Sequence, residues 1–321
     1  MPLPSICSFV KLLGPFHISI SKDILMSKFC KLFDTHCHIG LGASYGKRGP
    51  KVPLGHKAFR NTDDEKGCVA DFTKAAQSNV TRAVVVGIDQ ETSLMASRIA
   101  SHLNGLGLGA TAYSTSGIHP HSAQYFSSQF EGVKKLVEGG GVVAVGETGL
   151  DYFKSTAHAD PQMKSFEAHI ELAQKHHLPL IIHCRNADED MASTLSHWYS
   201  GYQGGIPGVL HCFSSNKFWM RQYLQLGFYI SFCGNVTYPR GRALQEACMQ
   251  CPLDRIVIET DSPFLPPTIP SSDDRRRRNE PANVIHTFDF ICKLRGVQEH
   301  ERETFAEQLW RNSCRLFNLD P

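Results

Sequence analysis

Six residues with metal-binding side chains follow short apolar runs of the chain. They are His36, His38, Glu147, His183, His211 and Asp261. The first two form an HxH pair, and Glu147 and His183 end the runs VVAVGE and LPLIIH. A single histidine at the end of such a run is more often a core residue than a ligand. Several histidines buried without partners would be costly, so the six together predict a metal centre.

The spacing of these residues also indicates which way they point. On a β-strand, residues two apart face the same side. His36 and His38 are therefore expected to face a common interior, with Cys37 between them facing the opposite way. The same alternation predicts that Cys184 and Cys212, each directly after a candidate ligand, point outward into packing. Imidazole and carboxylate ligands favour Zn, Mn, Fe or Mg over a thiolate structural zinc site.

The number of candidate ligands bears on the chemistry. Six are more than one open site needs, and they suit two metal ions that share a carboxylate. Two divalent ions about 3.5–4 Å apart can clamp the attacking and leaving oxygens of a displacement and generate hydroxide at neutral pH. This chemistry serves the hydrolysis of esters, amides and phosphodiesters.

The elements that would position these residues alternate between strand and helix patterns. The expected strands are Leu32–His38, Ala83–Ile88, Ala110–Ile118, Val142–Glu147, Leu180–His183, Val209–His211, Phe228–Phe232 and Arg255–Glu259. The expected helices are Asp64–Gln77, Glu91–Leu103, Phe126–Val137, Pro161–His176, Ala187–Tyr199, Arg242–Gln250, Ala282–Leu294 and Glu299–Leu316. Strands separated by helices run parallel, so this order predicts an α/β fold, a closed (β/α)8 TIM barrel with the candidate ligands at its C-terminal mouth. A doubly wound open sheet is the alternative.

The composition is that of an ordinary globular protein. The chain has 321 residues, a net charge of +2 and 41% hydrophobic residues. Its charge does not require a nucleic-acid partner, and no apolar stretch approaches the roughly 18 residues of a membrane span. Eleven scattered cysteines without a credible signal peptide predict reduced thiols in an intracellular compartment, cytoplasmic or nuclear.

The domain prediction divides the chain once. Residues 1–30 are expected to be a poorly ordered extension or a weak targeting segment, with mitochondrial import as an alternative, and residues 31–321 are expected to form the barrel.

Two basic loops are expected beside the candidate metal centre. The loop Gly40–Asn61 contains Lys47, Arg48 and Lys51 and no acidic residue, and Pro263–Asn279 contains Arg275, Arg276, Arg277 and Arg278. Both follow strands, which places them on the face where barrels build active sites. They are candidates for substrate binding, and a solvated surface is the alternative.

Several motifs of the chain also resemble those of one family. They are GIHPH (117–121), VAVGETGLDY (143–152), PLIIHCRNAD (179–188), GVLHCFSSN (208–216), IETDSPFL (258–265) and RNEP (278–281). In order and spacing they are similar to the TatD family of metal-dependent deoxyribonucleases, over the chain from about Leu32 onward. Thr148 and Ser215 depart from residues that are common in the family, and neither is a candidate ligand.

The resemblance implies roles for individual residues. One divalent ion (Mg, Mn or Zn) would be held by His36, His38, Glu147 and Asp261, and a second by Glu147, His183 and His211, so that Glu147 bridges. His119 and Arg185 would contact the scissile phosphate, and Asp261 could act as the base. Arg278 and Glu280 are expected to order the last loop through an ordinary salt bridge.

The implied substrate is DNA, and neither a membrane nor a protein partner is inferred. Two other functions remain open. One is a bimetal hydrolase of a small-molecule ester, amide or phosphate, and the other is a non-catalytic binding or scaffold protein, against which the complete ligand set argues.

Overall fold

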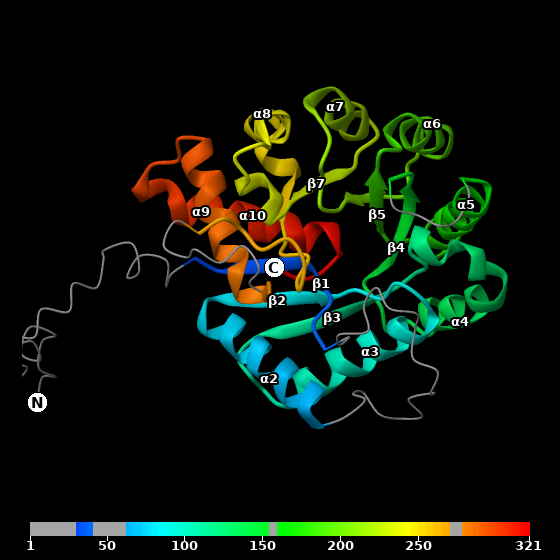
Figure 1. Ribbon diagram of the computed structural model, residues 1–321, viewed down its shortest axis with the longest axis horizontal. Coiled ribbons are helices and arrows are strands. Elements are labelled where there is room, and N and C mark those ends of the chain that lie inside the picture. Colours follow the sequence, from blue (N-terminus) through cyan, green and yellow to red (C-terminus); the bar gives the residue numbers. More distant parts are fainter. Residues whose placement is uncertain (1–29, 41–61, 154–158, 270–277) are drawn as a thin grey trace, which may run out of the picture.

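Eight parallel strands form one sheet in sequence order, surrounded by helices (Figure 1). The computed structural model describes residues 30–40, 62–153, 159–269 and 278–321. The strands are β1 (Leu32–Cys37), β2 (Val80–Val85), β3 (Thr111–Ser116), β4 (Ala144–Asp151), β5 (Leu180–Arg185), β6 (Gly208–Leu210), β7 (Tyr229–Phe232) and β8 (Ile256–Ile258). Each strand pairs with the next in parallel, as the alternating sequence pattern predicts.

The sheet closes between its first strand and the segment after its last. The backbone N–H of His38 donates to the carbonyl of Ser262 at 2.7 Å, and the N–H of Asp261 donates to the carbonyl of His36 at 2.9 Å. These bonds join β1 to the end of β8, so the predicted TIM barrel is confirmed and the open sheet is excluded.

Nine α-helices lie among the described residues. They are α2 (Thr62–Gln77), α3 (Gln90–Gly105), α4 (Phe126–Glu138), α5 (Ala159–His176), α6 (Asp188–Tyr199), α7 (Lys217–Gln225), α8 (Arg242–Gln250), α9 (Val284–Leu294) and α10 (Arg302–Leu316). Helix α7 was not expected, although Asn216 caps it by accepting from the N–H groups of Phe218 and Trp219. None of the described helices has the length and apolar character needed to cross a membrane.

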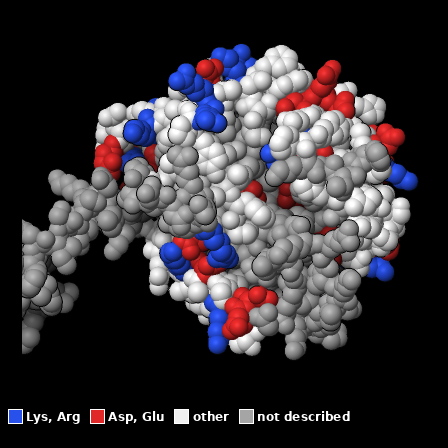
Figure 2. All heavy atoms as spheres, in the orientation of Figure 1, with Lys and Arg blue, Asp and Glu red and all other residues white. Residues whose placement is uncertain are grey.

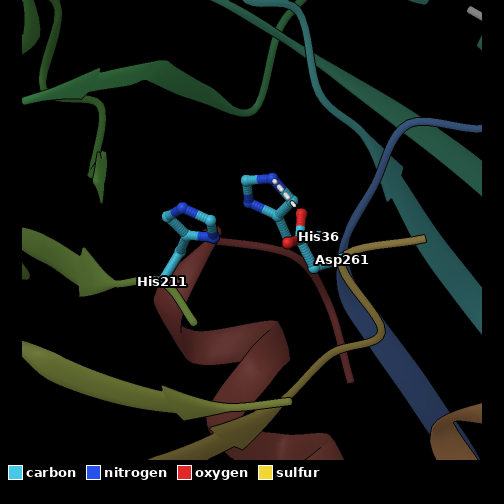
Figure 3. A group of neighbouring side chains, drawn as sticks. All are labelled: His36, His211 and Asp261. Atoms are coloured by element: carbon cyan, nitrogen blue, oxygen red, sulfur yellow. Dashed lines mark ion pairs between the residues drawn. The ribbon is translucent and has the colours of Figure 1, made fainter. Parts of the chain in front are cut away.

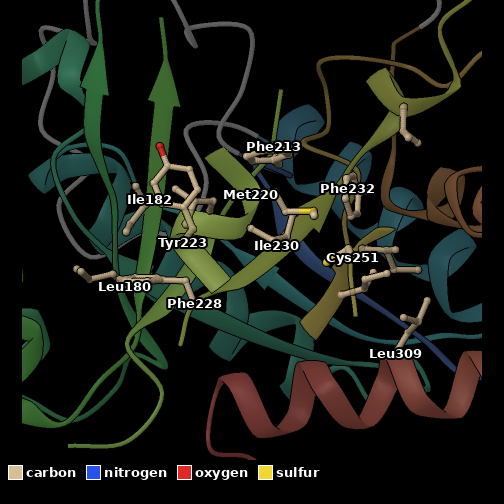
Figure 4. Packing of buried hydrophobic residues seen from close by; sticks show 14 of the residues in the cluster. Leu180, Ile182, Phe213, Met220, Tyr223, Phe228, Ile230, Phe232, Cys251 and Leu309 are labelled. Atoms are coloured by element: carbon tan, nitrogen blue, oxygen red, sulfur yellow. The ribbon is translucent and has the colours of Figure 1, made fainter. Parts of the chain in front are cut away.

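The core has an outer and an inner part. Strand residues such as Ile182 and Ile230 pack outward against helix residues such as Tyr223 and Met220 of α7 (Figure 4). An inner cluster contains residues of seven strands and of the chain end at Trp310 and Phe317. Its buried members from the strands and their ends are Phe33, Val84, Val86, Ala144, Ile181, Val209, Tyr229 and Val257. Burial on both faces explains why the strands read as continuous apolar runs.

Two irregularities turn ligand residues into the barrel. From Asp34 to Cys37, strand β1 advances by three residues while β2 advances by two. From Val145 to Thr148, β4 likewise advances by three residues while β5 advances by two. Each extra residue is a β-bulge, which reverses the side that later residues face. As a result His36, His38 and Glu147 point inward. Cys37 packs outward with Cys68 and Phe72, as predicted.

The close approach of β4 to β5 requires glycine at position 149. Gly149 has φ of +139°, and a Cβ atom there would lie 2.0 Å from the carbonyl oxygen of His183. A side chain would therefore meet backbone that cannot move without breaking the ladder. Gly67, exposed in the middle of α2, has open space around it.

Gly149→Ala should lower the free energy of unfolding by about 2–4 kcal/mol, because left-handed strain and overpacking each cost about 1–3 kcal/mol. Gly67→Ala is the matched control and should raise stability by roughly 0.5–1 kcal/mol, since alanine favours a helix interior. Urea unfolding followed by circular dichroism measures both. Equal stabilities of Gly149→Ala and wild type would contradict the assigned strand register.

Candidate metal centre

The six predicted ligands converge at the C-terminal mouth of the barrel. His36 and His38 come from β1 and the residue after it, Glu147 from β4 and His183 from β5. His211 and Asp261 follow β6 and β8. Figure 3 shows His36, His211 and Asp261 pointing toward one another from three separate segments. Five of the six residues are no more than 9% exposed, and His183 is partly exposed. In the space-filling view, acidic atoms appear near the middle of this face, and most Lys and Arg residues lie further out (Figure 2).

Glu147 is at the centre of the cluster. Its Oε1 atom lies 2.9 Å from Nε2 of His211 and 3.0 Å from Nδ1 of His183. Its Oε2 atom lies 3.4 Å from Nε2 of His36 and 3.7 Å from Nε2 of His38. The two carboxylate oxygens therefore face two different pairs of imidazoles, which is the arrangement that a bridging ligand requires.

Asp261 completes one of these groups. Its Oδ1 atom lies 3.4 Å from Nε2 of His38 and 3.7 Å from Nε2 of His36. We call His36, His38, Asp261 and the Oε2 atom of Glu147 the first ligand set. His183, His211 and the Oε1 atom of Glu147 form the second ligand set. The two sets touch, because the ring of His211 stacks on that of His36 with centroids 4.0 Å apart.

The donor atoms fit divalent metals. Nε2 of His36 lies 3.0 Å from Nε2 of His38, and Nδ1 of His183 lies 3.3 Å from Nε2 of His211. Two nitrogens that each bind an ion at about 2.0–2.1 Å are themselves about 3 Å apart. Buried imidazole and carboxylate atoms that converge at this spacing need a cation or protons between them. The donor set thus fits Zn, Mn or Mg chemistry.

The charges within the cluster reinforce one another. Burial by itself would raise the pKa of Glu147, but the neighbouring His211 and His119 outweigh burial and hold this pKa well below its usual value. Burial would lower the pKa of His211, yet Glu147 and Glu259 raise it well above its usual value. For His36, burial prevails and lowers the pKa. The centre therefore keeps Glu147 as an anion, the form that binds metal.

His119, predicted to contact phosphate, lies beside the second ligand set. It precedes the short 3₁₀ helix η3 (Pro120–Tyr125), and its Nε2 atom lies 3.3 Å from Oε1 of Glu147. Its Nδ1 atom accepts a hydrogen bond from the N–H of His121 at 3.0 Å. Burial lowers the pKa of His119 to about 4, so the ring is neutral near pH 7. It is close enough to Glu147 and His183 to share a metal ion with them.

Arg185, also predicted to contact phosphate, ends β5 two residues after His183. Its guanidinium lies 4.1 Å from the ring centroid of the half-exposed Phe153. Among the described residues, no carboxylate is within 4.0 Å of this guanidinium. The ring therefore orients a cation that has no described acidic partner, at the edge of the metal centre.

The two cysteines after candidate ligands behave differently. Cys184 points away from the centre, with its Sγ atom 3.8 Å from the Tyr223 hydroxyl, as predicted. The prediction for Cys212 is wrong, because its Sγ atom lies 2.9 Å from Sγ of Cys233 and close to Glu259. Strand β6 has already ended at Leu210, and Cys212 has φ of +42°, so strand alternation does not apply there.

The predicted basic loops are described only in part. Lys47, Arg48, Lys51 and Arg275–Arg277 lie outside the described residues. Arg278 pairs with Asp71 of α2 at 2.6 Å, and Glu280 pairs with Lys74 of the same helix. These ion pairs hold the chain from residue 278 onward against α2, so both residues form salt bridges as expected, with partners on another element.

Sequence reasoning missed two carboxylates behind the ligands. Asp151 and Glu259 are 1% and 0% exposed. Each contacts the ring nitrogen of a candidate ligand that points away from Glu147, Asp151 at His183 and Glu259 at His211. The sequence signal that could have found them is their proximity to candidate ligands. Asp151 is four residues after Glu147, and Glu259 is two residues before Asp261.

Comparisons with known proteins place this architecture in a family. Residues 33–318 match the family model described as TatD related DNase. The chain belongs to the TatD family. It is 34% identical to the 3'-5' ssDNA/RNA exonuclease TatD of Rahnella sp. (strain Y9602), over 77% of this chain and 90% of that protein. It is 33% identical to the metal-dependent hydrolase YabD of Bacillus subtilis, over 90% of this chain and 100% of that protein.

Solved structures agree with this assignment. The TatD homologue YJJV of Escherichia coli superposes with a TM-score of 0.72 and 26% identity, covering 91% of this chain and 100% of that one. A TatD-family hydrolase from Entamoeba histolytica gives a TM-score of 0.73 at 22% identity, covering 89% of this chain and 98% of that one, and so shares the fold. The protein is a TatD-family metal-dependent hydrolase.

Glu147→Gln tests the centre directly. The amide keeps the size of the side chain and removes the charge that holds two cations together, so metal content and hydrolysis of a model phosphodiester should both be lost. Mass spectrometry of the dialysed protein measures the metal. Glu138→Gln, on the surface of α4, is the control and should change neither quantity. Full metal content and turnover in Glu147→Gln would show that the ligands were assigned wrongly.

Proposed function

We propose that this TatD-family hydrolase is a deoxyribonuclease that cleaves DNA phosphodiester bonds with two divalent metal ions. The observation that carries the proposal is the position of Glu147, whose two oxygens face two separate sets of imidazoles. The first ligand set would hold one ion and the second set the other, with Mg, Mn or Zn as the candidates. Such ions activate water and stabilise the oxygens of a displacement.

Residues of the chain would supply the remaining chemistry. Burial would raise the pKa of Asp261, but His38 and His36 lower it, so the residue is a carboxylate at neutral pH. It would take a proton from the attacking water. Arg185, oriented by Phe153, and the neutral His119 would hold the phosphate and stabilise its developing charge.

The choice of DNA rests on three supports. Some relatives bear the name 3'-5' ssDNA/RNA exonuclease. Arg185 provides a cation without a described partner beside the centre. Lys47, Arg48 and Lys51 belong to a basic loop that follows β1, and we propose that they bind the DNA backbone. A small-molecule ester, amide or phosphate is the competing substrate class, because the same pair of ions serves it equally well.

The metal-loaded protein should hydrolyse DNA in preference to model carboxylic esters and amides. The experiment compares single-stranded DNA, double-stranded DNA, RNA and model esters with Mg, Mn and Zn. DNA binding, and with it DNA cleavage, should weaken with salt, because each phosphate contact releases counterions. The logarithm of the binding constant falls with the logarithm of salt concentration, with a slope per phosphate near −0.9 for duplex or −0.7 for single strands. Replacing Lys47, Arg48 and Lys51 together by alanine should flatten this slope.

A dinucleotide too short to reach the loop is the control, and the triple variant should cleave it as the wild type does. Hydrolysis of small esters alone, without any salt dependence, would favour the competing substrate class. Cleavage of RNA in preference to DNA would overturn the choice of DNA and leave the metal centre in place.

His119→Ala and Arg185→Ala should each lower turnover of DNA by about 10²-fold or more, through lost orientation and charge stabilisation. Both proteins should keep the metal content of the wild type, because neither residue belongs to the two ligand sets. Arg221→Ala, on the exposed side of α7, is the control for a lost surface cation and should leave turnover unchanged. Loss of an ion from His119→Ala would identify this histidine as a ligand.

A further inference from the structure

Both histidines of the second ligand set have a buried carboxylate behind them. In each ring one nitrogen faces Oε1 of Glu147, and the other nitrogen faces Asp151 or Glu259. A carboxylate in this place fixes which ring nitrogen carries the proton, holds the ring in one orientation and makes the inner nitrogen a stronger ligand.

Asp151 is held rigidly against His183. Its Oδ2 atom accepts from Nε2 of His183 at 3.1 Å and lies 3.0 Å from Nε2 of the partly exposed His121. Its Oδ1 atom accepts from the N–H of Phe153 at 2.9 Å. The side chain of Gln162, from α5, bonds both the N–H and the carbonyl of Asp151. The carboxylate is therefore fixed at both its backbone and its oxygens.

Glu259 plays the corresponding part for His211. Its Oε1 atom accepts from the N–H of Cys212 at 2.6 Å and lies 3.3 Å from Nδ1 of His211. The latter is an ion-pair contact rather than a linear hydrogen bond. Its Oε2 atom accepts from the hydroxyl of Ser231 at 2.6 Å. A fully buried carboxylate with these contacts has little freedom to leave the imidazole.

Among the described residues, the outer nitrogens of the first ligand set have other contacts. Nδ1 of His38 lies 2.9 Å from the carbonyl oxygen of Val86, a neutral acceptor. Nδ1 of His36 and Nδ1 of His211 both lack a hydrogen bond in the described part of the chain, but only Nδ1 of His211 has a carboxylate oxygen within 4.0 Å there. The two sets thus differ in what is behind their imidazoles, although their inner atoms look alike.

We propose that Asp151 and Glu259 are positioning residues that set the metal affinity of the second ligand set, and that the first set does not depend on them. The proposal rests on the two metal ions of the proposed function, but its test needs no substrate. Removing either charge should weaken the binding of one ion about 10–100-fold and leave the binding of the other ion unchanged.

The test uses the full-length metal-free protein titrated with Mn²⁺ and with Zn²⁺ by calorimetry. Asp151→Asn and Glu259→Gln keep the side-chain shape and should each lose affinity at one of two sites, so that dialysed protein retains one ion by mass spectrometry. Asp188→Asn is the matched control. This carboxylate, at the start of α6, accepts from the hydroxyls of Tyr223 and Ser215 and is not among the contacts of any ligand imidazole.

A second comparison assigns the weakened site. In a His38→Ala background, which disables the first ligand set, adding Asp151→Asn should lower the affinity for the remaining ion by the same factor. In a His211→Ala background, which disables the second set, adding Asp151→Asn should change nothing. The opposite pattern would overturn the proposal.

Further measurements separate positioning from folding. The metal-free variants should melt within a few degrees of the wild type, and excess metal should restore most of their hydrolysis. The melting temperature of the metal-free protein is the readout for folding, because added metal also stabilises the folded state by mass action. Wild-type affinity in both variants would overturn the proposal, whether the wild type binds one ion or two. A wild type that binds two ions and does not cleave DNA would overturn only the proposed substrate.

Discussion

The metal centre depends on one buried carboxylate and the imidazoles around it. Glu147 is 2% exposed, and an anion so far from water would be costly without partners. His183 and His211 approach one of its oxygens, and His36 and His38 approach the other. These rings come from β1, β5 and the ends of β1 and β6. The contacts between Glu147 and the imidazoles therefore join strands from distant parts of the chain. Each partner in turn requires its own support, which extends the charged cluster to Asp151 and Glu259.

The backbone meets this requirement with two departures from regular strands. One bulge lies in β1 between Asp34 and Cys37, at His36. The other lies in β4 between Val145 and Thr148, at Glu147. Without them, strict alternation from the inner-core residues Phe33 and Ala144 would turn both ligands toward the helices. The lower layer of the barrel can therefore be packed with apolar residues while the upper layer presents charge. Bulges next to active sites commonly have this use.

Much of this arrangement could be predicted from the sequence because it depends on local patterns. Alternating strand and helix signals indicated the barrel, and the placement of the six ligands at strand ends indicated the site. What was missed depends on tertiary contacts. The bulges have no local signal, Cys212 turns back because its strand has already ended, and the roles of Asp151 and Glu259 depend on which ring nitrogens face them. The short helix α7 was missed although its cap, Asn216, could be read from the sequence.

The position of the first ligand set connects metal binding to closure of the barrel. His36 and His38 are on β1, and Asp261 follows β8, the two strands between which the sheet closes. The backbone of the same residues makes the closing bonds, from Asp261 to His36 and from His38 to Ser262. Asp34 adds further bonds across this junction, accepting from the N–H and the hydroxyl of Thr260 at 2.8 and 2.6 Å. An ion held by the proposed ligands from both strands would bind only when the strands are joined. By mass action, its binding energy would therefore add to the stability of the closed barrel, at the junction that connects the two ends of the sheet.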